Sequence, residues 1–180
     1  AGDLEAGENF LLEIGPFVWR RYYDFAAIED VHSMKRQIHA VRGHGEIAVR
    51  GHNMKLGRGG IREIEFFVQT QQLIAGGRDP VLRGRTTVGM LDGLSAAGWI
   101  SSETAAGMTE AYAFLRRLEH CLQMRLDEQT HTLPEDDATL EVFARFAGFQ
   151  NAAALTATVT DTLQYVASEY ALLFEHAESL

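Results

Sequence analysis

The chain is organised around one stretch, KLGRGGIREIEFFVQ, at residues 55–69. Three of the four positions 57–60 are glycine, so the backbone there can adopt positive φ and approach other groups closely. The first residues after these glycines include Arg62, Glu63 and Glu65. Carboxylates are favoured near the positive end of a helix dipole. The stretch therefore predicts a glycine turn followed by a central helix at 61–75, which Gly76 and Gly77 end.

On a helical wheel the central helix has two apolar sides, which indicates packing between neighbours. The polar stripe between those sides is formed by Arg62, Glu65, Gln69 and Gln72. Gln71 points into the larger apolar arc and needs a hydrogen-bond partner there. Glu63 lies at an apolar border, about 160° around the helix from Glu65. The two carboxylates therefore do not form one paired acid–base site.

The rest of the chain predicts an all-α fold. We expect a single helical bundle of about six helices over residues 1–180, with a glycine-rich loop or short extended arm before the central helix. The remaining helices are predicted at 4–14, 24–42, 86–97, 101–127, 140–146 and from 151 onward. The first is expected to end at Gly15 and Pro16, and Ser101 and Asn151 are expected to be N-caps.

Composition excludes several classes of function. Lys and Arg number 16 against 25 Asp and Glu, and the net charge of −9 argues against a nucleic-acid partner. No apolar run approaches the roughly 20 residues of a membrane helix. The single cysteine, Cys121, favours a reducing cytoplasm. Because the chain begins without Met and enters structure almost at once, we expect it to be a fragment of a larger protein.

Two patterns suggest ligands. A glycine turn before a helix can hold phosphate at the helix N-terminus, and basic residues cluster around this turn. The pattern is neither a P-loop nor a full dinucleotide fingerprint. The alternative is that Glu63 and Glu65 only support the helix dipole and that Arg62 is their solvated neighbour.

A metal site is the weaker pattern. Glu29-x-x-His32 and Glu128-x-x-His131 have the spacing of di-metal carboxylate bundles, which need further inward-facing Glu residues. The first motif shares a face with basic neighbours and the second lies in a predicted loop. We therefore predict no metal site, with a di-metal bundle as the alternative.

Several motifs, in order along nearly the whole chain, resemble the bacterial glutamine synthetase adenylyltransferase family (glutamate–ammonia ligase adenylyltransferase). They are KLGxGGIREIEF at 55–66 with its continuation to 78, PFVxRRYxDF at 16–25, FLRRLE at 114–119 and DEQTxTLP at 127–134. The resemblance implies a helical domain of a large bifunctional enzyme in which each of two nucleotidyltransferase domains is followed by a helical domain. One half adenylylates a tyrosine of glutamine synthetase, and the N-terminal half removes the AMP by phosphorolysis. The PII protein and glutamine set the balance.

The resemblance is to the helical domain of the N-terminal, deadenylylating half. Its partners would be the upstream nucleotidyltransferase domain, glutamine synthetase and the PII protein. Mg²⁺ and ATP, ADP or phosphate would serve the parent enzyme. The Asp-x-Asp pair that holds Mg²⁺ in such enzymes is missing here, so we expect no cofactor in this fragment and no adenylyl-removing activity by it alone.

On this reading the glycine turn faces the catalytic domain. Nucleotide or phosphate contacts would come from Lys55, Arg58, Gly59, Gly60 and Arg62. Glu63 or Glu65 would have a supporting catalytic role, as a polar orienter or base. The rival interpretation is a non-catalytic module that binds PII or couples the two enzyme halves, with the aromatic cluster at 17–23 as its contact surface.

Overall fold

A computed structural model of the chain describes residues 2–20, 33 and 47–177. Within these residues the regular structure consists of six α-helices and one short 3₁₀ helix, η1 (Pro80–Leu82). An isolated antiparallel bridge joins Asn53 to Thr132. The all-α prediction is confirmed, and the segment before the central helix is a loop of turns with this one bridge residue, which is the loop alternative of the prediction. The predicted helix at 24–42 and the Glu29–His32 motif lie outside the described residues.

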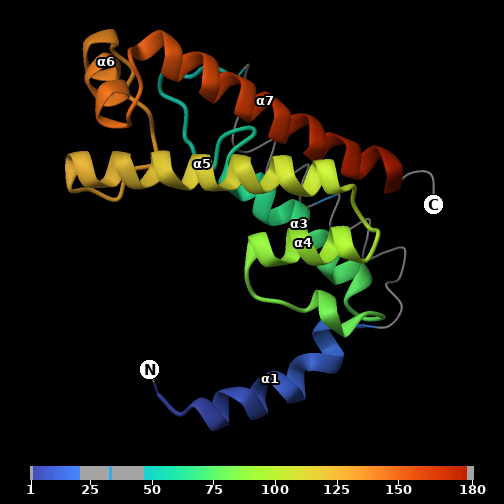
Figure 1. The fold of residues 1–180 in the computed structure, drawn as a ribbon. Coiled ribbons are helices and arrows are strands. Elements are labelled where there is room, and N and C mark those ends of the chain that lie inside the picture. The colour runs from blue at the N-terminus through green and yellow to red at the C-terminus, as the bar shows by residue number, and fades with distance from the viewer. Residues whose placement is uncertain (1, 21–32, 34–46, 178–180) are drawn as a thin grey trace.

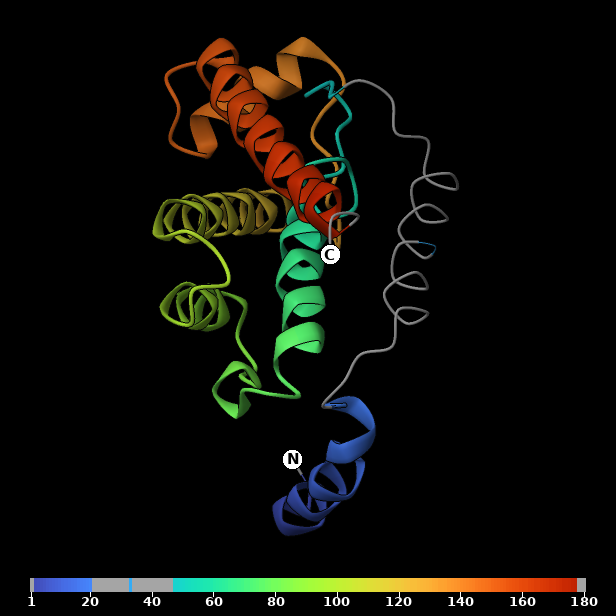
Figure 2. The same ribbon diagram turned by 90° about the vertical axis from the view of Figure 1, so that its right-hand side faces the viewer.

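The central helix is α3 (Ile61–Ala75), with the bounds that the sequence predicts. It contacts α4 (Thr87–Ala96), α5 (Ser102–Leu126) and α7 (Ala152–Ala177). Figure 1 shows α7 slanting above α5 and approaching one end of it, and Figure 2 shows α3 running along the middle of the bundle. Buried side chains from the larger apolar side of α3 fill the space between these neighbours, among them Ile61, Ile64, Phe67 and Val68. Phe66, on the second apolar side, is half-buried and packs against the same core.

The last two helices close one end of the bundle. The helix α6 (Asp137–Phe146) packs against α7. The predicted caps of α5 and α7 are confirmed, because Ser101 Oγ accepts the Thr104 N–H at 2.9 Å and Asn151 Oδ1 accepts the Ala154 N–H at 2.9 Å. The predicted start of α6 at 140 was wrong. Asp136 caps this helix by accepting the Thr139 N–H at 2.8 Å, so the helix begins three residues earlier.

The first helix, α1 (Leu4–Val18), lies apart from the other described helices in both views (Figures 1 and 2). Its predicted end at Gly15 and Pro16 was wrong, because the helix continues through Pro16 to Val18. Proline removes one backbone donor, but the next turn still closes, with the Trp19 N–H bonded to Gly15 O at 2.8 Å. None of its side chains is buried. Among the described residues, no helix has the length and apolar character needed to cross a bilayer.

Candidate functional site

The glycine turn is wound by Asn53. Its side-chain Oδ1 accepts the N–H groups of Lys55 at 3.1 Å and Leu56 at 2.8 Å, and its carbonyl accepts the Gly57 N–H at 2.7 Å. Asn53 is itself held by the loop after α5, because the Met54 N–H donates to His131 O at 2.7 Å. The turn is therefore fixed from both sides before the helix begins.

Gly59 is the most crowded of the three glycines in the turn. Its φ is +73°, and a Cβ built there would overlap the backbone carbonyl of Leu163 in α7. The backbone of α7 thus lies directly against the turn. Glycine at this position is required by both the left-handed conformation and the close approach.

Each backbone N–H from residue 59 to residue 63 already has an acceptor. Gly59 donates to Glu63 Oε2 at 2.9 Å, and the next four amides donate to carbonyl oxygens of the turn at 3.0 Å. A phosphate at this helix start would therefore find no spare amide, and its contacts would have to come from side chains. The nucleotide contacts predicted for Gly59 and Gly60 stay a prediction. In the structure, these two glycines shape the turn.

The two acids of the motif lie in different surroundings, as the wheel predicts. Glu63 is 8% exposed and accepts the Gly59 N–H. Burial, and after it the negative charge of Glu63, raises the pKa of the Tyr170 hydroxyl in α7. Glu65 is less buried, with its Oε2 3.2 Å from Arg62 Nη1 and its Oε1 3.5 Å from the Tyr112 hydroxyl. Glu63 therefore belongs to the interior of the turn, and Glu65 borders the solvent.

Of the two neighbouring glutamines of α3, Gln71 is buried as predicted and Gln72 is buried against the prediction. Gln72, placed on the polar stripe by the wheel, is buried. Its Nε2 donates to the carbonyls of Leu82 at 2.8 Å and Gly84 at 3.0 Å, because the loop after α3 folds back over this part of the helix. Gln71 is buried as predicted, and within the described residues its Nε2 has no hydrogen-bond partner.

The three basic residues of the motif point to different places. Arg62 pairs with Glu65. Arg58 is exposed and lines a hollow of about 530 Å³ with Gln164 and Ser168 of α7. Lys55 is half-buried, and its Nζ lies 3.6 Å from Glu119 Oε1. The structure therefore does not bring the predicted anion contacts together at one point.

A charged cluster that the motif analysis missed is centred on Glu119 of α5. Glu119 is 1% exposed, yet its carboxylate lies 2.7 Å from Arg116 Nη1 and 2.9 Å from His131 Nδ1, in addition to Lys55. A buried carboxylate needs such partners, because moving a charge out of water without a partner costs several kcal/mol of free energy, on the order of the desolvation penalty per ion. The available signal was its place beside Leu115, Leu118 and Leu122 on the core stripe of α5, which predicts burial.

Metal ligands are not assembled in the described part of the chain. No three His, Cys, Asp or Glu side chains there lie close enough together to hold a metal ion. The Glu128–His131 motif is split, because His131 approaches Glu119.

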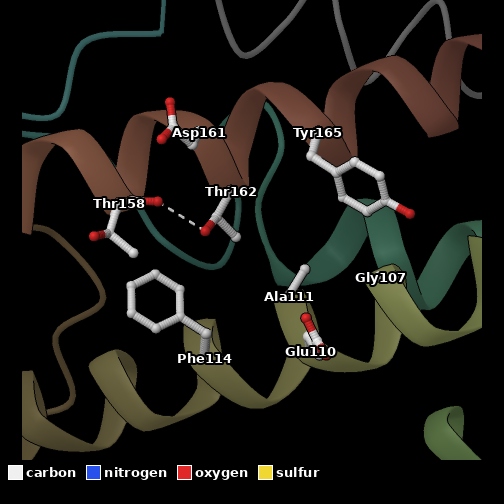
Figure 3. Close-up of a pocket in the computed structure, with 8 residues that line it drawn as sticks. All are labelled: Gly107, Glu110, Ala111, Phe114, Thr158, Asp161, Thr162 and Tyr165. Carbon is white, nitrogen blue, oxygen red and sulfur yellow. Dashed lines mark hydrogen bonds between the residues drawn. The ribbon is translucent and has the colours of Figure 1, made fainter.

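A second hollow, of about 480 Å³, lies between α5 and α7 (Figure 3). Its charged side chains are Glu110 and Asp161, and no basic residue lines it. Tyr165 also lines it, and burial, followed by the charges of nearby glutamates, raises the pKa of its hydroxyl. An acidic hollow of this kind disfavours a phosphate ligand.

Comparison with known proteins assigns the family. A family model described as GlnD PII-uridylyltransferase matches residues 32–174. Proteins named bifunctional glutamine synthetase adenylyltransferase/adenylyl-removing enzyme match nearly the whole chain. The one from Mesorhizobium japonicum is 62% identical over 180 residues, which is 100% of this chain and 18% of that protein. Those from Rhizobium meliloti and Xanthobacter autotrophicus are each 59% identical, over 180 and 175 residues.

The Rhizobium match covers 100% of this chain and the Xanthobacter match 97%, and each covers 18% of the relative. The chain thus spans about a fifth of the length of these proteins. The match extends through α3 and the glycine turn, and also through α1, which the family model does not reach. The chain therefore belongs to the GlnD PII-uridylyltransferase family and fits a helical domain of the bifunctional glutamine synthetase adenylyltransferase/adenylyl-removing enzymes.

Proposed function

We propose that the chain is the helical domain that flanks the deadenylylating nucleotidyltransferase site of a bifunctional enzyme acting on glutamine synthetase in the cytoplasm. The observation that carries this proposal is the identity of 62% over all 180 residues to a protein of that name. The motifs at 16–25, 55–78 and 114–134 support the same assignment. ATP, ADP, phosphate and Mg²⁺ would be bound by the enzyme as a whole.

The metal-dependent step would take place outside this chain, because the sequence lacks the Asp-x-Asp pair that holds Mg²⁺ in such enzymes. We expect the chain alone to release no ADP from adenylylated glutamine synthetase when phosphate and Mg²⁺ are supplied. The measurement is a coupled ADP assay, with the full-length enzyme as the positive control. ADP release by the chain alone would overturn this part of the proposal.

Within the full-length enzyme, the glycine turn and the first turn of α3 would face the catalytic domain. Glu65, Arg62 and Arg58 are the exposed or half-buried charges of this surface and are our candidates for contact with substrate. Glu63 would act indirectly, because its carboxylate is used to hold the Gly59 N–H inside the turn. Glu65 is therefore the sharper test of a supporting catalytic role.

The experiment compares three variants of the full-length enzyme. Glu65→Gln should slow deadenylylation at unchanged thermal stability, whereas Glu63→Gln should lower the melting temperature because it weakens a buried charge-assisted hydrogen bond. Glu110→Gln, an exposed acid on α5, is the matched control and should change neither property. Wild-type deadenylylation by Glu65→Gln would leave only the helix-supporting account of the two acids.

The second candidate function is the coupling module, in which this domain binds PII or links the two enzyme halves. The exposed apolar side chains of α1, including Phe17 in the predicted aromatic contact surface, favour it. Capture of purified PII by the chain, lost on Phe17→Ser, would support this candidate. Absence of binding at micromolar concentrations of both proteins would count against it.

A further inference from the structure

The cluster around Glu119 holds more positive charge than its carboxylate needs. Lys55 approaches one carboxylate oxygen of Glu119 and Arg116 the other, so two permanent cations share one anion. His131 approaches the same carboxylate from the loop after α5. The cluster has a net positive charge in a chain whose overall charge is −9.

The spare charge faces solvent. The side chains of Lys55 and Arg116 are 34% and 36% exposed, whereas that of Glu119 is 2% exposed. Their contacts with Glu119 are ion pairs rather than well-aligned hydrogen bonds. Arg116 Nη2 also lies 3.4 Å from His120 Nε2 at the surface. The ammonium and guanidinium groups have further donors for a ligand on the solvent side.

We propose that Lys55 and Arg116 together bind a phosphate group, with Glu119 and His131 as the residues that position them. Both cations contact the same carboxylate, which places the two side chains close to one another. The guanidinium offers a fork that matches phosphate oxygens, and the ammonium adds a compact positive charge. The site is distinct from the helix N-terminus of α3, where the amides are already used.

The fold fixes the backbone that carries Lys55. Asn53 accepts the Lys55 N–H and so fixes the backbone from which the lysine extends. The hydrogen bond from the Met54 N–H to His131 O joins the same turn to the loop that carries His131. A site whose charges are held in place before the ligand arrives loses little entropy on binding.

The proposal rests on the proposed function in one respect only, that such an enzyme handles phosphoryl groups. The ligand is either free phosphate or the phosphate chain of a nucleotide. The test is therefore a direct titration of the 180-residue chain with inorganic phosphate, ADP and adenosine at constant ionic strength, followed by calorimetry. Adenosine, which has no phosphate, is expected not to bind.

The variants are Lys55→Met and Arg116→Met, with Arg117→Met as the matched control, because Arg117 is the exposed neighbour on the same helix. We expect each of the first two to weaken binding about tenfold or more, the control to bind like the wild type, and Arg116→Lys to recover part of the affinity. Circular dichroism melting of each variant excludes loss of fold as the cause.

Tighter binding of ADP than of phosphate would identify a nucleotide as the source of the phosphate group, and equal binding would identify free phosphate. No saturable binding by the wild type below about 10 mM, which lies above the usual range of substrate affinities, would overturn the proposal. An equal loss in Arg117→Met would also overturn it, since binding would then depend on overall charge. Neither result bears on the Glu65→Gln experiment, so the two proposals can fail separately.

Discussion

Two helices of equal length, α1 and α3, have opposite surroundings. Each has 15 residues and several large apolar side chains. Nine residues of α3 are buried, four of them polar, whereas α1 has no buried residue. Phe67 of α3 is 3% exposed, and Phe10 of α1 is 59% exposed. Apolar periodicity is present in both helices, but only the contacts with α4, α5 and α7 place α3 in the core.

The difference extends to how each helix is held. The N-terminus of α3 is locked by the glycine turn, the buried Glu63 and Gln72 are hydrogen-bonded inside the bundle, and α7 lies against the helix. The described contacts of α1 with the bundle are at its C-terminal end, where Trp19 lies beside Gly76 and Arg83 stacks on the indole with 5.7 Å between its Cζ and the ring centroid. The large apolar side chains that α1 exposes, among them Phe10 and Phe17, are typical of a face that another protein surface covers.

The largest effect is expected at the turn that locks α3. Gly59→Ala should destabilise the chain by more than about 4 kcal/mol, in the range that single substitutions rarely reach, because its Cβ would overlap the backbone of Leu163. Gly98→Ala is the matched control. Its φ of +75° is almost the same, but nothing lies within 4 Å of the added Cβ. It should cost only about 1 kcal/mol, the price of the left-handed backbone. Urea unfolding measures both values, and equal losses would show that the contact with α7 is not decisive.

The next comparison sets the core phenylalanine of α3 against an exposed one in α1. Phe67→Ala should lower the free energy of unfolding by about 3–5 kcal/mol, because it removes a buried ring and leaves a cavity. Phe10→Ala should change it by less than about 0.5 kcal/mol, as for other exposed positions. Chemical denaturation of both variants tests the contrast. A large loss in Phe10→Ala would mean that α1 is packed in solution, and the comparison of the two helices would break.

The smallest effect is a dependence of stability on pH that belongs to the turn, since α1 contains no histidine. Burial lowers the pKa of His52, while hydrogen bonds with the backbone at Arg58 and Ala48 oppose this shift less strongly. Below the unfolded-state pKa of about 6.5, the unfolded chain takes up a proton that the folded chain resists. Stability should therefore fall as the pH is lowered from 7 to 5, by less than about 1.4 kcal/mol per pH unit.

Urea unfolding of His52→Gln at pH 7, 6 and 5 should show a smaller slope than the wild type. His120→Gln, an exposed histidine, is the control and should keep the wild-type slope. The lowered carboxyl pKa values of Asp136 and Glu141, caused first by hydrogen bonds from the backbone N–H groups of Thr139 and Ala152, act only near pH 4 and below. A wild-type slope in His52→Gln would assign the pH dependence to another group.

The features that sequence alone predicts are those set by local geometry. The bounds of α3, the caps at Ser101 and Asn151, and the separation of Glu63 from Glu65 all follow from residues a few positions apart. The continuation of α1 through Pro16 and the cap at Asp136 are local as well, but there two local preferences compete. At Pro16 the expected helix stop was overridden by continued helical hydrogen bonding. At the start of α6 the cap at Asp136 placed the first helical residue before the apolar pattern begins.

The site is less predictable because its contacts join distant segments. Nothing near Glu119 in sequence indicates that Lys55 and His131 meet there, and the burial of Gln72 depends on the path of the loop after α3. The glycine pattern predicted a turn, yet whether its amides were free or used could be known only from the acceptors around them. Tertiary contacts, rather than propensities, decide both questions.

The paired hydrogen bonds between residues 52–54 and residues 131–133 also have a consequence for synthesis of the chain. The turn meets residues 131–133 only after about 80 further residues have been made. This takes about 4–16 s at a synthesis rate of about 5–20 residues per second. Contacts so distant in sequence form late, because the intervening loop must first be closed. The glycine turn is thus expected to be completed after α4 and α5 have emerged from the ribosome, among the last parts of the bundle to become native.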